Sequence, residues 1–257
     1  MERYQVILAY DGTQFQGFQR QLNARTVQGV LEESLRLLGW RGQSVLAAGR
    51  TDAGVHAAGQ VVAFDLQWLH SESELLQALN AHLPSDVAAR RVGIAPNDFH
   101  PRYAAKARRY QYRLFCDAIR APLQERYSWR VWPELSIALM QQATAHLHGV
   151  HDFAAFGAPH RSGGSTVREI SRAKWYEDGK NLVFEIVGNA FLYHMVRRLV
   201  SFLVKIGQGQ VSPEQMLDRL ENGGQAAVQG LAPAHGLCLC EVIYPADLCD
   251  KNEFEDC

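Results

Sequence analysis

The fold is decided by a stretch that runs from Ser44 to Leu66 and reads SVLAAGRTDAGVHAAGQVVAFDL. It contains two apolar runs, residues 44–48 and residues 60–66, and in the second run Val62, Phe64 and Leu66 alternate with other residues. Alternation of this kind is typical of half-buried strands. We therefore expect two strands here, joined by the polar, glycine-containing segment between them.

The joining segment, from Gly49 to Ala57, is the best candidate for a reactive site. It carries the carboxylate Asp52, with Arg50 two residues before it and Gly54 two residues after it. Connections between strands usually lie at the surface and present reactive groups, and a glycine there lets a ligand come close to the backbone. A carboxylate on such a turn, with a cation nearby, is suited to act as a nucleophile or general base. The alternative is an ordinary turn in which Asp52 hydrogen-bonds its own backbone.

The composition is typical of a soluble globular protein that folds without disulfides or metals, since the 257 residues are 47% hydrophobic and 21% charged. The N-terminus leads directly into strand-like sequence, so we expect no secretory signal. The longest apolar stretch, residues 191–206, is interrupted by basic side chains, and we expect it not to span a membrane. Five cysteines do not make an even disulfide framework, so a reducing cytoplasm is the expected location.

The net charge is −1, but the charges are unevenly distributed. Residues 246–257 hold five acidic side chains and one lysine, and we expect this acidic tail to be disordered. Arginines cluster in two places, between residues 102 and 113 and between residues 161 and 172. Such clusters can bind phosphates, and a solvated surface is the simpler alternative.

Strand and helix signals follow one another in the order β-α-β-β-α-β, and this order occurs twice. In the first half a helix begins at the cap Thr26 and ends at Gly39, and Ser71 and Glu74 form a capping box for a second helix that Pro84 ends. The other expected elements are strands at residues 4–10, 44–48, 60–66, 86–94, 107–115, 167–176, 182–187 and 237–244, and helices at residues 133–147 and 190–206 and after Ser212-Pro213.

Two successive units of this type indicate an α+β fold made of two ferredoxin-like halves. We expect an N-terminal subdomain at residues 1–100, which carries the Asp52 loop, and a C-terminal subdomain at residues 101–245. The halves are expected to form one extended mixed or antiparallel sheet, with helices on one face. The other face would form a cleft for RNA, which is often recognised on sheet surfaces.

Two further groups of residues have side chains that could bind a ligand or take part in a reaction. Tyr110 lies in a strand-like run, Arg108-Arg109-Tyr110-Gln111-Tyr112, where it could stack on a base or act as a general base, or simply pack as strand tyrosines often do. Arg197 and Arg198 lie in a strongly apolar helical segment. Whichever of them faces inward needs a carboxylate partner, because a buried unpaired guanidinium is very costly, and extension to solvent is the alternative for either.

No metal or nucleotide cofactor is expected. His146, His148, His151 and Asp152 resemble a metal cluster, but no H-E-x-x-H spacing supports it, and histidines near a helix C-terminus are favoured there in any case. The Cys238-x-Cys240 pair has no second pair to complete a zinc site. Neither a dinucleotide-binding nor a P-loop glycine motif is present, nor is the signature of the zinc deaminases.

Taken together, these motifs resemble the TruA family of tRNA pseudouridine synthases. The resemblance extends over nearly the whole chain to about Tyr244, and the run from Gly49 to Ala57 is its most specific part. Phe18 stands where a tryptophan is common, and Phe156-Gly157 where a phenylalanine-arginine pair is common. The other matching motifs are Tyr10-Asp11-Gly12-Thr13, Gly17-Phe18-Gln19, Thr26-Val27-Gln28, Phe99-His100-Pro101-Arg102, Arg109-Tyr110-Gln111-Tyr112, His151-Asp152-Phe153, the run from Phe191 to Arg197, and Ala232-Pro233-Ala234 followed by Gly236-Leu237.

The resemblance implies isomerisation of uridine to pseudouridine at positions 38, 39 and 40 in the anticodon stem-loop of tRNA, without cofactor or metal. It implies that Asp52 is the nucleophile, that Tyr110 stacks on the target base and assists proton transfer, and that Arg197 pairs with the Asp52 carboxylate. It also implies a cytoplasmic homodimer, with tRNA crossing between the subunits. Arg50 would help to extrude the nucleotide, and the implied substrate-binding residues are Tyr110, Arg50, His56 and Arg20.

Two other functions compete with this interpretation. The first is a non-catalytic RNA-binding protein with two RRM-like units, which would need paired aromatic runs on its central strands. We find no such runs, and this function gives no reason for the Asp52 turn. The second is a metal-dependent hydrolase that uses the histidines near Asp152, which metal analysis of the purified protein would detect.

Overall fold

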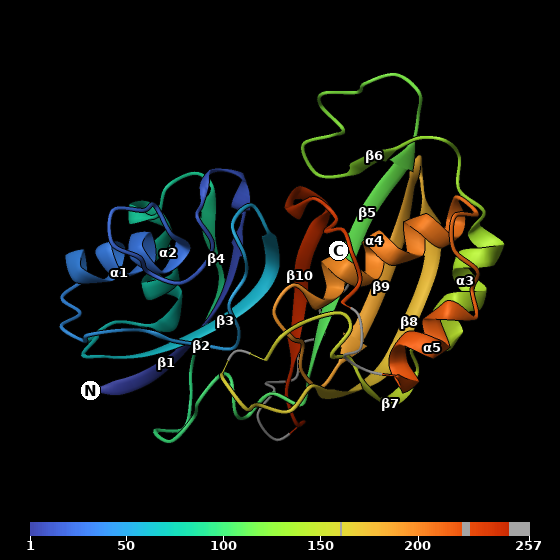
Figure 1. Cartoon of the computed structure of the whole chain (residues 1–257). Helices are drawn as coiled ribbons and strands as arrows, with labels where there is room; N and C mark the ends of the chain where they lie inside the picture. The colour runs from blue at the N-terminus through green and yellow to red at the C-terminus, as the bar shows by residue number, and fades with distance from the viewer. Residues whose placement is uncertain (160, 223–226, 247–257) are drawn as a thin grey trace. The chain divides into compact units, whose positions relative to one another are not determined.

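The computed structural model describes residues 1–159, 161–222 and 227–246 of the chain (Figure 1). The fold class is confirmed as α+β. The chain divides into two compact units, the first made of Met1–Lys106 together with residues from Cys238 onward, and the second made of Ala107–Leu237. The expected acidic tail, residues 246–257, lies outside the described residues except for Ala246.

The sheet of the first unit has the strand order β4-β1-β3-β10, and β2 also pairs with β3. The central strand β1 is antiparallel to both of its neighbours, and β10 is parallel to β3. The register of β1 and β3 places Tyr10 beside Ala57 at one end and Arg3 opposite Asp65 at the other. The strands are β1 (Glu2–Tyr10), β2 (Leu46–Ala47), β3 (His56–Leu66), β4 (Val87–Ile94) and β10 (Leu237–Ile243).

The two helices of the first unit begin where the sequence predicts. Helix α1 (Val27–Leu37) is capped by Thr26, whose side chain accepts a hydrogen bond from the Gly29 N–H. Helix α2 (Glu72–His82) begins with the predicted capping box of Ser71 and Glu74. Both helices bury the apolar residues that recur at helical spacing, which join the fully buried Val6 and Leu8 of β1 in the core.

The sheet of the second unit has the strand order β5-β9-β8-β7, with β6 parallel to β5. Its strands are β5 (Ala107–Cys116), β6 (Trp129–Val131), β7 (Gly149–Asp152), β8 (Val167–Asp178) and β9 (Asn181–Gly188). The helices α3 (Ile137–Ala145), α4 (Met195–Gly207) and α5 (Gln215–Glu221) lie together over one face of it (Figure 1). Alternate residues of β5, Tyr112 and Leu114, are fully buried in the core.

Several expected boundaries differ from the structure. The helix expected from Pro133 begins at Ile137, because the Ser136 side chain accepts a hydrogen bond from the Leu139 N–H and caps it there. The helix expected at residues 190–206 begins only at Met195. The short strands β6 and β7 were not expected, since three or four residues give too little periodicity to detect.

The chain passes from the first unit to the second between Lys106 and Ala107, and it returns to the first unit at Cys238. The cause of the return is strand pairing, since Cys238 and Leu239 of β10 pair with His56 and Ala57 of β3.

Candidate active site

Asp52 lies in a tight turn between β2 and β3, and its residue is half-buried. The turn is closed by the backbone, since the Val55 N–H donates to the Asp52 carbonyl oxygen at 3.2 Å. Arg50, on the same connection, is exposed. The predicted strand-turn-strand arrangement around Asp52 is therefore present.

Residues 11–18 belong to the connection between β1 and α1, residues 11–26, which we call the first loop; they pack against the Asp52 turn and hold it in place. The Gly54 N–H donates to the Phe15 carbonyl oxygen at 3.2 Å, and the Phe18 N–H donates to the Thr51 carbonyl oxygen at 3.0 Å. The Thr51 hydroxyl is further bound to the Tyr10 hydroxyl at 2.8 Å. Hydrogen bonds thus flank Asp52 on both sides in the sequence, and they fix the backbone from which its carboxylate projects.

His56, the first residue of β3, joins the two loops. Its side chain is buried, its Nδ1 accepts a hydrogen bond from the Gly12 N–H at 3.0 Å, and the same atom lies 3.2 Å from Asp11 Oδ1. His56 therefore holds the first residues of the 11–18 loop beside the Asp52 turn.

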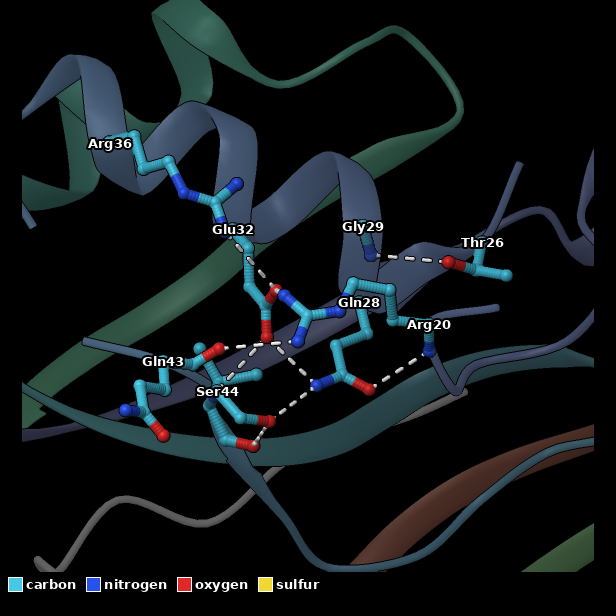
Figure 2. A network of polar contacts seen from close by, with 9 residues as sticks. Arg20, Thr26, Gln28, Gly29, Glu32, Arg36, Gln43 and Ser44 are labelled. Carbon is cyan, nitrogen blue, oxygen red and sulfur yellow. Dashed lines mark hydrogen bonds and ion pairs between the residues drawn. The ribbon is translucent and has the colours of Figure 1, made fainter. Parts of the chain in front are cut away.

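Arg20 lies farther along the first loop, and its guanidinium is bound within the unit. Nη1 forms a close ion pair with Glu32 of α1, and Nη2 donates to the Gln43 carbonyl oxygen at 3.3 Å (Figure 2). About half of the side chain remains exposed, at 48% of its accessible surface. Glu32 was not predicted from the sequence. An acidic residue among the apolar positions of an amphipathic helix is nevertheless a feature from which a buried carboxylate could have been predicted.

In the second unit, Tyr110 lies on β5 opposite Ile186 of β9. Its ring packs edge-on against Phe191, with ring centroids 5.0 Å apart. The next tyrosine on the same side, Tyr112, is completely buried and donates to the Pro233 carbonyl oxygen at 2.8 Å. Burial raises the pKa of Tyr112, so its phenol stays neutral and structural. Tyr110, which is only half-buried, is the tyrosine of this strand suited to meet a ligand.

Arg197 is the third residue of α4 and is half-buried, and its Nε donates to the Ala232 carbonyl oxygen at 2.8 Å. The residue before the helix, His194, has a left-handed backbone with φ 65° and stacks its ring on Tyr193 at 3.7 Å. A non-glycine residue in this region is strained and often lies at a functional site. Sequence reasoning missed His194, because its position in an apolar run gives no sign of its backbone angles.

The site residues predicted from sequence are thus divided between the units. The first unit carries Arg20, Arg50, Asp52 and His56, and the 11–18 loop brings His56 together with the Asp52 turn. Arg20 is instead joined to α1 through Glu32. The second unit carries Tyr110 and Arg197.

In the parts of the chain that the structure describes, no three histidine, cysteine, aspartate or glutamate side chains are arranged as a metal site. Of the histidines near Asp152, His151 has its Nε2 only 2.8 Å from the His148 carbonyl oxygen. Among the described residues, no helix has the length and apolar character needed to cross a bilayer.

Comparison with known proteins gives consistent matches over nearly the whole chain. A family profile described as tRNA pseudouridine synthase matches residues 6–104 and 143–245. The chain is 43% identical over 246 residues to tRNA pseudouridine synthase A of Geobacillus kaustophilus (strain HTA426), covering 95% of both proteins. It is 38% identical over 244 residues to the protein of the same name from Geotalea uraniireducens (strain Rf4), and the match covers 95% of this chain and 100% of that protein. The protein of that name from Ligilactobacillus salivarius (strain UCC118) is 41% identical over 247 residues, 95% of this chain and 96% of that protein.

Proposed function

The chain belongs to the family of tRNA pseudouridine synthases, and from that premise we propose that it converts uridine to pseudouridine at positions 38, 39 and 40 of the tRNA anticodon stem-loop, with Asp52 as the nucleophile. It is an isomerase that acts on tRNA. The observation that supports Asp52 most directly is its turn, in which the backbone on both sides of the carboxylate is held by the 11–18 loop.

The reaction rearranges bonds within one nucleotide and needs no second substrate. The bond between N1 of the base and C1′ of the ribose breaks, the base turns, and C5 bonds to C1′. The hydrogen on C5 leaves as a proton, and N1 takes up a proton. A carboxylate that attacks C1′ or C6 of the base forms a covalent link that holds the intermediate during this rotation, and this link breaks again before the product leaves. A fixed carboxylate is favoured for this role, since a misplacement of about 1 Å can cost about 10²-fold in rate.

Tyr110 and Arg197 are the partners that we assign to Asp52 in this reaction. Tyr110 stacks on the target base and assists proton transfer, and Arg197 forms an ion pair that orients the Asp52 carboxylate. The target uridine lies in a stem and must leave its stack, at a cost of roughly a few kcal/mol. Arg50, exposed beside the turn, helps to extrude it, and Tyr110 stacking offsets part of the cost. Arg20 and His56 complete the substrate-binding region of the first unit.

The decisive test is release of tritium from tRNA that carries uridine labelled at C5. We expect the purified protein to release tritium without any added metal or cofactor, because C5 loses its hydrogen when it bonds to C1′. Mapping of the product should place pseudouridine at positions 38 to 40. Tritium release equal to that of a sample without protein would contradict the proposed function.

Replacing Tyr110 by phenylalanine should lower the rate of pseudouridine formation by roughly 10²-fold or more, because the phenol is lost while the stacking ring remains. The affinity for tRNA should stay within about twofold, since stacking does not need the hydroxyl. Tyr103→Phe, at a tyrosine that is 72% exposed, is a control with the same chemical change. Rapid turnover by Tyr110→Phe would rule out a role for the hydroxyl and leave only stacking.

Raising the salt concentration should weaken tRNA binding steeply. The arginine clusters at residues 102–113 and 161–172 are candidates for phosphate contacts, and each phosphate contact releases a counterion when it forms. Six contacts would lower the affinity about 10³-fold between 50 and 200 mM salt. The dissociation constant should be measured by filter binding over that range, and a flat response would argue against phosphate contacts.

We propose further that the protein is a cytoplasmic homodimer, with one tRNA crossing between the subunits. The resemblance of the chain to its family supports this assignment. Light scattering of the free protein should give twice the mass of one chain, and a monomer at micromolar concentration would contradict it.

A further inference from the structure

Glu32 of α1 is a completely buried carboxylate, with 0% of its side chain exposed. Its oxygens are nevertheless fully engaged. Oε1 accepts hydrogen bonds from the Gln28 side chain at 2.8 Å and from the Val45 N–H at 3.2 Å. Oε2 forms the close ion pair with Arg20 and lies 3.6 Å from Nη2 of Arg36 (Figure 2). A buried carboxylate without such partners would strongly destabilise the fold. Glu32 therefore requires Arg20, Gln28 and the Val45 N–H to stay within bonding distance of its oxygens.

The contacts of Glu32 anchor two segments that are distant in the sequence. One is the first loop, where the Arg20 side chain binds Glu32 and the Arg20 N–H donates to the Gln28 side-chain oxygen at 3.0 Å. The other is the segment before β2, where Val45 binds Glu32 directly and the Ser44 hydroxyl accepts from Gln28 at 2.8 Å. In Figure 2 these side chains converge beneath α1.

Both anchored segments lead to the Asp52 turn. Phe18, two residues before Arg20, donates its N–H to the Thr51 carbonyl oxygen, and its own carbonyl oxygen accepts from the Gln28 N–H at 2.9 Å. Val45 opens the segment that continues through β2 to Asp52. The carboxylate of Glu32 is therefore linked to the Asp52 backbone by one route through the first loop and by another through β2.

We propose that Glu32 is a positioning residue for the reaction, and that it acts through Arg20, Gln28 and Val45 to hold the Asp52 turn in its reactive geometry. This inference rests on the proposed function of Asp52. It also gives Arg20 a structural task beside substrate binding, since its guanidinium binds Glu32 while 48% of the side chain stays exposed.

The test is a comparison of Glu32→Gln with the wild-type protein in single-turnover assays with saturating tRNA. Glutamine keeps the shape of the side chain but removes the charge that binds Arg20. We expect the rate of tritium release to fall about 10- to 100-fold, by the misplacement argument made for Asp52. The dissociation constant for tRNA should change less than about threefold, so the effect lies in the chemical step.

A control variant separates positioning from the mere loss of an ion pair in the same unit. Asp65 forms an ion pair with Arg3 at 2.7 Å in the same unit, at the end of β1 and β3 that lies roughly 23 Å from Tyr10 by strand geometry. Asp65→Asn removes a charge from this pair and should leave the single-turnover rate within twofold of wild type. Equal single-turnover rates for the two variants would overturn the proposal. A loss of rate in Glu32→Gln that disappears at saturating tRNA would overturn it as well.

Hydrogen exchange provides a readout that is independent of activity. In Glu32→Gln the Phe18 and Gly54 amides should exchange at least about 10-fold faster, while the amides that pair β1 with β4 stay protected. If glutamine prevents folding, Glu32→Asp, which keeps the charge but shortens the side chain, is expected to show the same amide changes with a smaller rate loss. Unchanged exchange at Phe18 and Gly54 in the folded variant would overturn the proposal. If the wild-type protein itself releases no tritium, the proposed function fails instead.

Discussion

Replacing Asp52 by asparagine should abolish pseudouridine formation while the fold and the binding of tRNA remain intact. The amide has the shape of the carboxylate but cannot form the covalent link to the nucleotide, so the chemical step is lost. The backbone bonds that hold the turn, from Val55 to Asp52 and from Phe18 to Thr51, do not involve the side chain and should persist. We expect the single-turnover rate to fall by at least about 10³-fold, since loss of a nucleophile can cost up to about 10⁶-fold.

Three measurements make this prediction specific. Circular dichroism and filter binding should show the same fold and tRNA affinity for Asp52→Asn as for wild type, and the tritium assay should show no product. Asp98→Asn, at an exposed position in the same unit, is the control and should retain the wild-type rate. Asp52→Ala should behave like Asp52→Asn, and it cannot regain a carboxylate by deamidation. Product formed by either Asp52 variant at near-normal rates would refute the nucleophile assignment.

The elements predicted well from the sequence are those with strong local signals. Thr26 and the Ser71–Glu74 capping box begin α1 and α2 where expected, because an N-cap is a contact between residues three positions apart. The turn that carries Asp52 was likewise predicted, since alternation in the following strand and a glycine in the connection are both local features. Features that depend on contacts between residues a few positions apart can thus be predicted from the sequence.

What the sequence could not reveal depends on residues that are distant in the chain. Arg20 and Glu32 are 12 positions apart, and nothing in either segment indicates that the guanidinium binds a buried acid beneath α1. The predicted start of α4 was wrong for a related reason. Residues 190–194 continue an apolar pattern, but the Tyr193 N–H donates to the Ala158 carbonyl oxygen, and His194 adopts a left-handed backbone. These tertiary contacts override local helix propensity.

Replacing Gly12 by alanine should have the second-largest effect, through the backbone alone. A Cβ atom at this position would lie 2.0 Å from the Val55 carbonyl oxygen and 2.5 Å from its carbonyl carbon. Both atoms belong to the backbone, so the chain must move to admit the methyl group. Val55 closes the Asp52 turn by its hydrogen bond to the Asp52 carbonyl oxygen, and a shift of Val55 therefore moves the carboxylate. The expected outcome is a loss of about 10²-fold in the chemical step and of about 1–3 kcal/mol in stability.

Gly93→Ala on β4 is the matched control, because a Cβ there meets nothing within 4 Å. It should unfold at the wild-type denaturant concentration and form pseudouridine at the wild-type rate. For Gly12→Ala, urea unfolding should give the stability loss, and single-turnover tritium release should give the rate loss at saturating tRNA. A second replacement, Gly17→Ala, should act in the same direction, since its Cβ would lie 2.8 Å from the Thr51 carbonyl oxygen and its φ of +92° disfavours any side chain. Gly12→Ala would displace the contact between the 11–18 loop and the Val55 backbone. If this variant loses stability but keeps the wild-type rate, then Asp52 does not depend on the 11–18 loop for its position.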